Sequence, residues 1–385
     1  MIMVPRSEKL PRFAEFFCGG GMVRAGLPGW ECAFANDIDP MKCTAYRENF
    51  GGDALIEGDI AHVSDDALQQ RIDLYWASSP CQDFSLAGKG AGLEGARSGV
   101  FGTWISRIAP LIAAGHAPKI IAFENVTGLV TRREGRDFLS VVSDLQRLGY
   151  LVGALSIDAA RFVPQSRPRL FVICIREDAV PPDLAGAEPS EPFHTPALRR
   201  FRERHAAEIG DRWRWWSLPE PTEPRRELVD CVEWTGPHRW LSEPEIQHLL
   251  GMMSPPSRDR VTAARRSGEP RIGMLYRRGR PDAEGRIRQR AEVRFDGLAG
   301  CLRTPSGGSS RQTMLLIDGD ETRARLLSAR EAIRLMGLGD GYRIPERYNA
   351  AYKVAGDGVV APIVTYLDRH LFQPVLARTR AVIAA

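Results

Sequence analysis

The chain has 385 residues, a formal net charge of +4 at pH 7, 43% hydrophobic residues and 26% charged residues. These values are close to the globular average, which excludes a disordered chain or a fibrous repeat, and the length favours one large domain with a smaller one. The longest apolar stretch, residues 105–123, is interrupted by charge and proline, so we expect no membrane span. Seven cysteines without a CxxC pair, and an N-terminus without an evident secretory signal, predict a reducing cytoplasmic setting and no bound metal.

Residues 1–180 consist of short apolar runs separated by stretches of helical period. We predict strands at residues 13–17, 32–35, 74–77, 120–123 and 170–175, and a helix at residues 138–148. Strands that alternate with helices indicate the α/β class, with a doubly wound and mostly parallel sheet. This segment is therefore expected to form the large domain.

The following segment, residues 181–325, is irregular and rich in Trp, Arg, Pro and Gly, and we expect it to form the smaller domain. Residues 258–294 carry twelve arginines against five acids, a local charge of +7. A solvated loop could carry this charge, but an anionic partner such as nucleic acid explains it better. The RWRWW run at residues 212–216 fits either the core of the small domain or a nucleic-acid contact.

Regular structure is expected to return in residues 326–385, a hinge and C-terminal segment. Ser328 and Glu331 match a capping box, which predicts the start of a helix that carries Ile333 and Met336. The apolar residues 359–372 are expected to form a last helix that returns to the large domain.

Glycines and acids follow the first three predicted strands. The first strand runs into FAEFFCGGGM at residues 13–22, and glycines there let the backbone approach a ligand closely. Asp37 follows the second strand, about twenty residues along the chain, where a carboxylate can accept both hydroxyls of a ribose. Asp59 follows the third strand, where it could accept from an adenine amine. The order favours a bound adenosine, and the missing GxGxxG pattern argues against a nicotinamide dehydrogenase.

A thiol follows the fourth strand. Cys81 lies after Pro80 and before a polar, glycine-rich stretch, which places it at the mouth of the sheet rather than in the core. The thiolate is the reactive form of cysteine, and nearby arginines lower its pKa. Glu124 ends the next strand, and Arg167 and Arg169 precede another. We expect these four side chains to converge at the carboxyl edge of the sheet, where open α/β folds bind ligands.

These features together resemble the DNA (cytosine-5) methyltransferase family. The resemblance covers residues 13–176 and about 323–372 and rests on eight motifs in the family's order: FxG at 17–19, Asp37, GDI at 58–60, PCQxFS at 80–85, ENV at 124–126, QxRxR at 165–169, REAIRLMG at 330–337 and AYKVAGDGV at 351–359. Each motif alone is weakly specific, but the ordered set is highly specific.

The resemblance implies a Rossmann-like catalytic domain that transfers a methyl group from S-adenosylmethionine to carbon 5 of a flipped-out cytosine. Cys81 would add to carbon 6, Glu124 would hold ring nitrogen 3 and the exocyclic amine, and Arg169 would bind the exocyclic oxygen. Arg167 would support the thiolate and the glycine-rich loop that follows it, which is expected to close on DNA. The resemblance also implies DNA contacts at Gln82, Ser85 and Gln165, and the polar loop around residues 306–312 offers Arg311 as a further one.

The cofactor residues implied by the resemblance begin with Phe17, which would stack on adenine. The others are Gly19, Gly21, Asp37, Ile38, Asp59, Ile60, Pro80, Val100 and Asp357. Three residues depart from the family's usual pattern: Met22 replaces a glycine, Ile38 stands where an aromatic or other apolar residue is common, and Asp357 stands where Asn is more frequent. None of these departures removes a catalytic group.

The expected substrate is double-stranded DNA, with residues 181–325 as the target-recognition domain. There the basic stretch at 258–294 would contact phosphate and the loop around residues 306–312 would approach base edges. A cognate restriction endonuclease is a possible partner, and we expect a monomer in a bacterial or phage-infected cytoplasm. Two alternatives remain: a tRNA cytosine-5 methyltransferase, and a catalytically silent DNA-binding homologue.

Overall fold

The structure, a computed structural model, describes residues 9–79, 99–223, 225–281, 284–303 and 311–384. It divides into two compact units. The first comprises residues 1–157, 168–220 and 363–385, and the second comprises residues 158–167 and 221–362. No helix in the described residues is long and apolar enough to cross a membrane.

The first unit is built on a seven-stranded sheet in the order β3-β2-β1-β4-β5-β7-β6. The predicted mixed α/β fold is confirmed: the first five of these strands run parallel and β7 runs antiparallel to β5. The bounds are β1 Arg12–Phe16, β2 Glu31–Asp37, β3 Leu55–Glu57, β4 Leu74–Ala77, β5 Ile120–Val126, β6 Tyr150–Asp158 and β7 Pro168–Arg176. The helices and short strands are α1 Met22–Gly26, α2 Pro40–Phe50, α5 Val100–Ala113, α6 Arg136–Arg147, β8 Ala185–Gly186, α7 Pro196–Arg204, α8 Ala206–Ile209, β9 Trp215–Trp216, α14 Ala361–Leu367 and α15 Gln373–Ala384.

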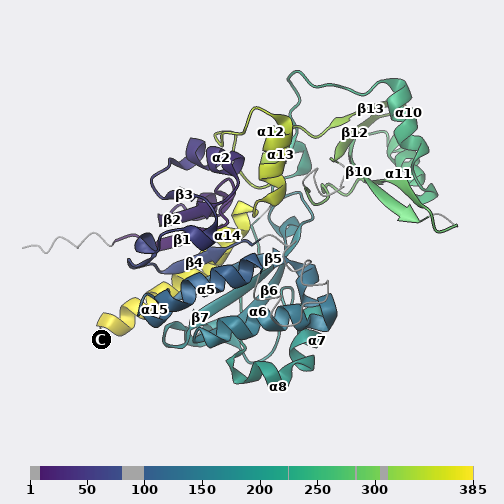
Figure 1. Ribbon diagram of the computed structural model, residues 1–385. Helices are drawn as coiled ribbons and strands as arrows, with labels where there is room; N and C mark the ends of the chain where they lie inside the picture. Colours follow the sequence, from purple (N-terminus) through teal and green to yellow (C-terminus); the bar gives the residue numbers. More distant parts are fainter. Residues whose placement is uncertain (1–8, 80–98, 224, 282–283, 304–310, 385) are drawn as a thin grey trace, which may run out of the picture. The chain divides into compact units, whose positions relative to one another are not determined.

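Helices cover both faces of this sheet (Figure 1). On one face Phe16 packs with Trp104 of α5, and Phe123 with Phe101. Because side chains alternate along a strand, their neighbours point to the other face. There Phe372, in the turn of π-helix that precedes α15, lies over Trp30 and Trp76, each with ring centroids 6.3 Å apart.

The RWRWW segment belongs to the core of the first unit, which corrects both interpretations of it. Trp213 and Trp216 are buried, and the indole Nε1 of Trp216 donates to the carbonyl of Ile173 in β7 (2.9 Å). A side chain on Gly153 of β6 would collide with Trp216, so this glycine makes room for the indole. The segment is apolar because it completes the large core.

The second unit contains a regular four-stranded antiparallel sheet in the order β11-β10-β12-β13, where the sequence indicated irregular structure. Helices α10 and α11 pack on one face through Leu249 and Val261, which meet Leu275, Val293 and Leu315 of the strands. The bounds are α9 Leu228–Cys231, α10 Glu243–Gly251, α11 Pro255–Arg266, β10 Arg271–Pro281, β11 Ile287–Arg294, β12 Thr313–Asp318, β13 Glu321–Leu326, α12 Ala329–Arg334 and α13 Tyr348–Asp357.

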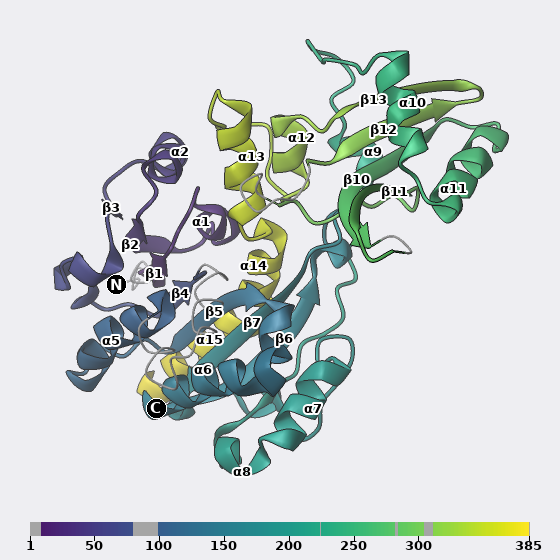
Figure 2. The same cartoon turned by 45° about the vertical axis from the view of Figure 1, so that its right-hand side comes forward.

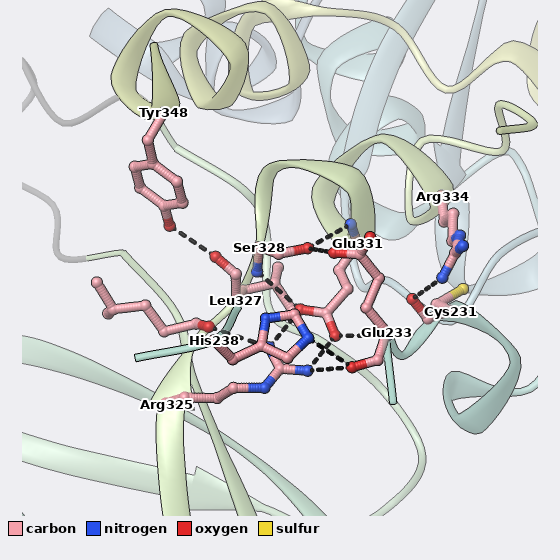
Figure 3. Close-up of polar contacts among 10 residues, drawn as sticks. Cys231, Glu233, His238, Arg325, Leu327, Ser328, Glu331, Arg334 and Tyr348 are labelled. Atoms are coloured by element: carbon pink, nitrogen blue, oxygen red, sulfur yellow. Dashed lines mark hydrogen bonds and ion pairs between the residues drawn. The ribbon is translucent and has the colours of Figure 1, made fainter. Parts of the chain in front are cut away.

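A buried ion pair joins β13 to α12 in this unit (Figure 3). Arg325 donates to both carboxylate oxygens of Glu331 (2.6 and 2.8 Å), and both side chains are 1% exposed. Glu331 also accepts from the main-chain N–H groups of Ser328 (2.7 Å) and Glu233 (2.8 Å). The predicted capping box is thus present. Besides capping α12, the carboxylate of Glu331 neutralises the buried Arg325 and binds the main chain at Glu233.

Candidate active site

The loop after β1 is held by the carboxylate at the end of β2. Asp37 Oδ2 accepts from the main-chain N–H of Gly19 (2.8 Å), and Oδ1 accepts from that of Asp39 (2.9 Å). Phe17, which precedes this loop, has a φ of 58°, a conformation that non-glycine residues rarely adopt. Strain of this kind persists where surrounding structure enforces it, often at ligand sites.

Gly21 could not be replaced without rearrangement. Its φ is 79°, and an added Cβ would lie 2.6 Å from the ring of Phe50 and 2.9 Å from that of Tyr46. The glycine therefore lets α2 pack closely behind the loop. Met22, where the family usually has a glycine, is buried at the start of α1.

Ile38 follows β2 and Asp59 follows β3, at the same carboxyl edge of the sheet. Ile38 is 65% exposed, although it directly follows the buried Asp37. Asp59 caps the short helix 60–62 by accepting from the N–H of Ala61 (2.9 Å), and Ile60 is buried beneath it. An exposed apolar side chain directly after Asp37, with a second carboxylate after the neighbouring strand, has the chemistry expected of a nucleoside site.

Glu124 and Arg169 meet at the carboxyl end of β5. They belong to adjacent antiparallel strands, and the guanidinium Nε lies 3.1 Å from Glu124 Oε1. Both side chains are largely buried, at 10% and 16% exposed. The structure thus brings together a carboxyl and a cation that the sequence places 45 residues apart.

Asn125, which the sequence analysis did not assign, holds the segment after β4. Its side-chain Nδ2 donates to the carbonyl of Ser79 (3.2 Å). Ser79 is two residues before Cys81 in the sequence. The ENV motif therefore carries a second function in its asparagine, which ties the end of β4 to β5.

Four predicted site residues, Pro80, Cys81, Gln82 and Ser85, lie outside the described residues. Val100 begins α5 and is half-buried. The roles of all five in the site remain predictions.

Arg167 and Gln165 belong to the second unit and are buried there. Arg167 donates through Nη2 to the carbonyls of Gly356 and Gly358 (both 2.8 Å), and through Nη1 to that of Leu302 (2.9 Å). Gln165 donates to the carbonyl of Leu335 (2.8 Å) and accepts from the N–H of Leu302 (3.1 Å). Because its amide is engaged by main chain and fully buried, we assign Gln165 to holding these segments and not to contacting DNA.

The loop residues at the start of β12 are also engaged within the second unit. Gln312 is buried and bonds to both the N–H and the carbonyl of Gly300, which corrects the expectation that it reaches base edges. Arg311 is half-buried, donates to Asn349 and lies over the ring of Tyr348 (5.1 Å). Residues 304–310 lie outside the described residues, and Asp357 ends α13 in the same unit.

In the part of the chain that the structure describes, no three His, Cys, Asp or Glu side chains are grouped as metal ligands would be.

The thiols of Cys18, Cys32 and Cys43 lie near the loop after β1. Burial raises the pKa of all three, that of Cys32 to about 11 and that of Cys43 to about 12. Since nucleophilic cysteines have lowered pKa values, these three are structural.

The family model for C-5 cytosine-specific DNA methylases matches residues 11–373. The chain belongs to this family. It is therefore a DNA (cytosine-5) methyltransferase by family, as the ordered motifs predicted.

Curated relatives span most of both chains. The chain is 26% identical over 364 residues to the type II methyltransferase M.HhaI of Haemophilus parahaemolyticus, covering 94% of each chain. It is also 26% identical over 383 residues to M.HpaII of Haemophilus parainfluenzae, covering 94% of this chain and 89% of the relative. Among solved structures, the Dnmt2 methyltransferase of S. pombe matches with a TM-score of 0.60 at 16% identity, covering 95% of this chain and 99% of the other, which supports the fold.

Proposed function

We propose that the enzyme methylates carbon 5 of a cytosine flipped out of duplex DNA, through a covalent adduct with Cys81. The observation that carries the proposal is the ion pair between Glu124 and Arg169 at the sheet edge. A carboxyl and a guanidinium held side by side can bind ring nitrogen 3 and the exocyclic oxygen of one cytosine, which lie on the same edge of the base. These two groups would read a base outside the stack, because ring nitrogen 3 is covered by the partner base in a paired duplex.

The residues around the loop after β1 fit S-adenosylmethionine as the cofactor. Asp37 uses one hydrogen bond on each oxygen for the main chain, and a carboxylate oxygen can accept a second, here from a ribose hydroxyl. The exposed Ile38 offers an apolar surface to adenine, with Phe17 and Asp59 on the neighbouring strand ends. When bound, the cofactor supplies an electrophilic methyl group.

The chain's own groups would perform the remaining chemistry. The Cys81 thiolate would form a bond from Sγ to carbon 6. Glu124, after taking up a proton from solvent, would place that proton on ring nitrogen 3, which leaves carbon 5 electron-rich. After methylation, the proton on carbon 5 leaves to solvent and the electron pair of that bond re-forms the double bond between carbons 5 and 6. The carbon–sulfur bond breaks to release the Cys81 thiolate, and ring nitrogen 3 returns its proton to Glu124. Arg169 stabilises the exocyclic oxygen throughout. Arg167 acts as a positioning residue, since it anchors the main chain at residues 302 and 356–358.

We favour duplex DNA over tRNA as the substrate. The second unit carries the basic stretch at 258–294, and the curated relatives M.HhaI and M.HpaII are type II methyltransferases. We further propose that the enzyme acts as a monomer on bacterial or phage DNA in the cytoplasm. A restriction endonuclease is its candidate partner.

The test measures transfer of a labelled methyl group to duplex DNA and to tRNA. Wild type should label the duplex, Cys81→Ala should label neither, and a duplex with 5-fluorocytosine at the target should form a covalent adduct with wild type alone. Fluorine blocks the final proton loss, so the adduct accumulates. Labelling of tRNA but not of DNA would establish the alternative substrate, and methylation by Cys81→Ala would exclude the thiolate mechanism.

A further inference from the structure

The carboxylate of Asp59, which we expect beside the adenine amine, lies outside the sheet. It follows β3 (Leu55–Glu57), an edge strand of three residues that lies beside β2 in Figure 2. Asp59 is exposed, and its Oδ1 accepts from the N–H of Ala61 within its own helical turn (2.9 Å). This bond orients the carboxylate on the turn, but the position of the turn depends on contacts with other elements.

On the amino side of Asp59, the main chain is held by Asn36 of β2. The buried amide of Asn36 donates through Nδ2 to the carbonyls of Ile56 and Gly58 (both 2.9 Å). The N–H of Gly58 in turn donates to the carbonyl of Asp37 (3.0 Å). The end of β2 therefore carries both the carboxylate that we assign to the ribose and an anchor for the segment that follows β3.

On the carboxyl side of Asp59, the main chain is held by Arg107 of α5. Its Nη2 donates to the carbonyl of Val63 and to Oδ1 of Asp65, each at 2.5 Å. These two oxygens belong to the turn that joins the short helices 60–62 and 66–68. One nitrogen of a helix side chain thus ties this turn to α5.

Apolar side chains place the same segment on α5. Ile60 and Val63 are buried in one cluster with Trp104 and Ile108 of that helix. Hydrophobic contact is non-directional, so it brings the segment to the helix without fixing how the main chain is turned. The hydrogen bond from Arg107 to the Val63 carbonyl adds this direction.

The fold depends little on Arg107. The side chains of Arg107 and Asp65 are 29% and 36% exposed, and ion pairs in contact with solvent stabilise a fold only slightly. Phe101 and Trp104 fix α5 on the sheet independently, through aromatic rings of β5 and β1. We therefore expect loss of the guanidinium to affect mainly the segment that it holds.

We propose that Arg107 is a positioning residue of the cofactor site, which together with Asn36 holds residues 59–65 so that the Asp59 carboxylate is in place for the adenine amine. The inference rests on the proposed function, because it takes S-adenosylmethionine as the cofactor. It goes further in naming two residues outside the eight motifs that identify the family. An exposed carboxylate that is already held in place loses less conformational freedom on binding, which favours affinity.

Three variants test the role of the guanidinium. Arg107→Met removes it and keeps an apolar stem, whereas Arg107→Lys keeps the charge. Because both contacts of Arg107 come from a single nitrogen, one ammonium group can donate to both oxygens. Thermal unfolding midpoints of all variants check that each protein is folded.

Arg12→Met is the matched control. Arg12 begins β1, at the edge of the sheet opposite the loop after β1. Like Arg107, it joins a carboxylate, that of Glu31 (3.1 Å), to a main-chain carbonyl, that of Arg71 (3.4 Å). Its side chain is also similarly exposed, at 24% against 29%.

The readout is calorimetry with S-adenosylhomocysteine and with S-inosylhomocysteine, which carries an oxygen in place of the adenine amine. Wild type should prefer the adenosyl compound by about 10–100-fold, the usual contribution of a hydrogen bond to a charged group. Arg107→Met should bind the adenosyl compound about tenfold more weakly and the inosyl compound less than about twofold more weakly. Arg107→Lys should recover most of the lost affinity, and Arg12→Met should match wild type.

The two compounds separate this inference from the proposed function. If Arg107→Met keeps the wild-type preference, or loses equal affinity for both compounds, the positioning role is wrong and the cofactor assignment stands. If wild type binds both compounds equally, Asp59 does not contact the amine, and this inference again fails alone. If wild type binds neither compound, S-adenosylmethionine is not the cofactor, and the proposed function fails as well.

Discussion

Glu124 and Arg169 form an ion pair across adjacent antiparallel strands, with Nε and Oε1 3.1 Å apart and both side chains largely buried. The pairing keeps the two groups in a fixed relation before substrate binds, so little reorganisation is required at the moment of reaction. It also means that each group depends on the other for its orientation, because a buried charge without a partner is costly.

Replacing either member should therefore reduce the rate of methyl transfer more than DNA binding. We expect Glu124→Gln to lower the single-turnover rate by about 10²–10⁴-fold, the usual contribution of a positioned acid. Arg169→Lys keeps the charge but loses the planar guanidinium, and its single-turnover rate should also fall by at least tenfold. Rapid-quench methylation assays measure the rate and anisotropy measures affinity. A Glu124→Gln enzyme with a wild-type rate would remove Glu124 from the mechanism.

The exposed Ile38 gives a prediction about the cofactor. Ile38→Ser removes apolar surface next to Asp37 and should weaken S-adenosylmethionine binding by about 3–10-fold, since a few buried CH₂ groups are worth about 1 kcal/mol or more. Calorimetry measures the affinity. Ile287→Ser is the matched control, because Ile287 is a similarly exposed isoleucine of the second unit, at 72% against 65%. Equal affinities in the two variants would mean that Ile38 does not contact the adenine.

Local signals in the sequence predicted much of the first unit and little of the second. The strand at 74–77 was predicted with the bounds it has, and the capping box of Ser328 and Glu331 is present, because both signals lie within a few residues. Strands β10 and β11 were missed because their outer halves are exposed on both sides and carry arginine. Such residues give no alternation of apolar and polar side chains.

The structural partners of the QxRxR motif at residues 165–169 could not be predicted either. Arg167 bonds to carbonyls at residues 302, 356 and 358, and main-chain carbonyls have no sequence signature. The position of the RWRWW segment could not be predicted for a related reason. The sequence left open the core of the small domain or a nucleic-acid contact, whereas long-range packing, here the space at Gly153, places the segment in the core of the first unit. The sequence thus identified the chemical groups. Tertiary structure decides which of these groups are held inside the protein and which can contact a ligand.

The buried pair of Arg325 and Glu331 gives a prediction about stability. Glu331→Gln leaves the guanidinium in the core without its counter-charge and should lower the free energy of unfolding by about 3–5 kcal/mol. The chain offers a matched control in Glu245, which occupies the same capping-box position after Ser242 and pairs with Arg239, but at the surface. Because solvent screens that pair, Glu245→Gln should leave the stability nearly unchanged. Urea unfolding of both variants measures the difference, and equal effects would show that burial does not strengthen the dependence on the carboxylate.

The carboxyl of Glu15 in β1 should make stability fall as pH rises. Burial raises the pKa of Glu15 well above its ordinary value, the charge of Asp37 adds to this, and the charge of Arg24 opposes it. Above about pH 4.5 the unfolded chain releases this proton while the folded chain keeps it, so deprotonation favours unfolding and stability is lost with increasing pH.

Glu15→Gln has the shape of the protonated carboxyl and no proton to lose, so it should match wild type near pH 4.5 and be increasingly more stable toward pH 8. Thermal unfolding midpoints across this range measure the difference. Glu31→Gln removes the same charge from an exposed residue of β2 and should follow the wild-type profile. A difference between Glu15→Gln and wild type that stays constant, or shrinks, as pH rises would mean that Glu15 is ionised in the folded protein, with the positive charge of Arg24 outweighing its burial.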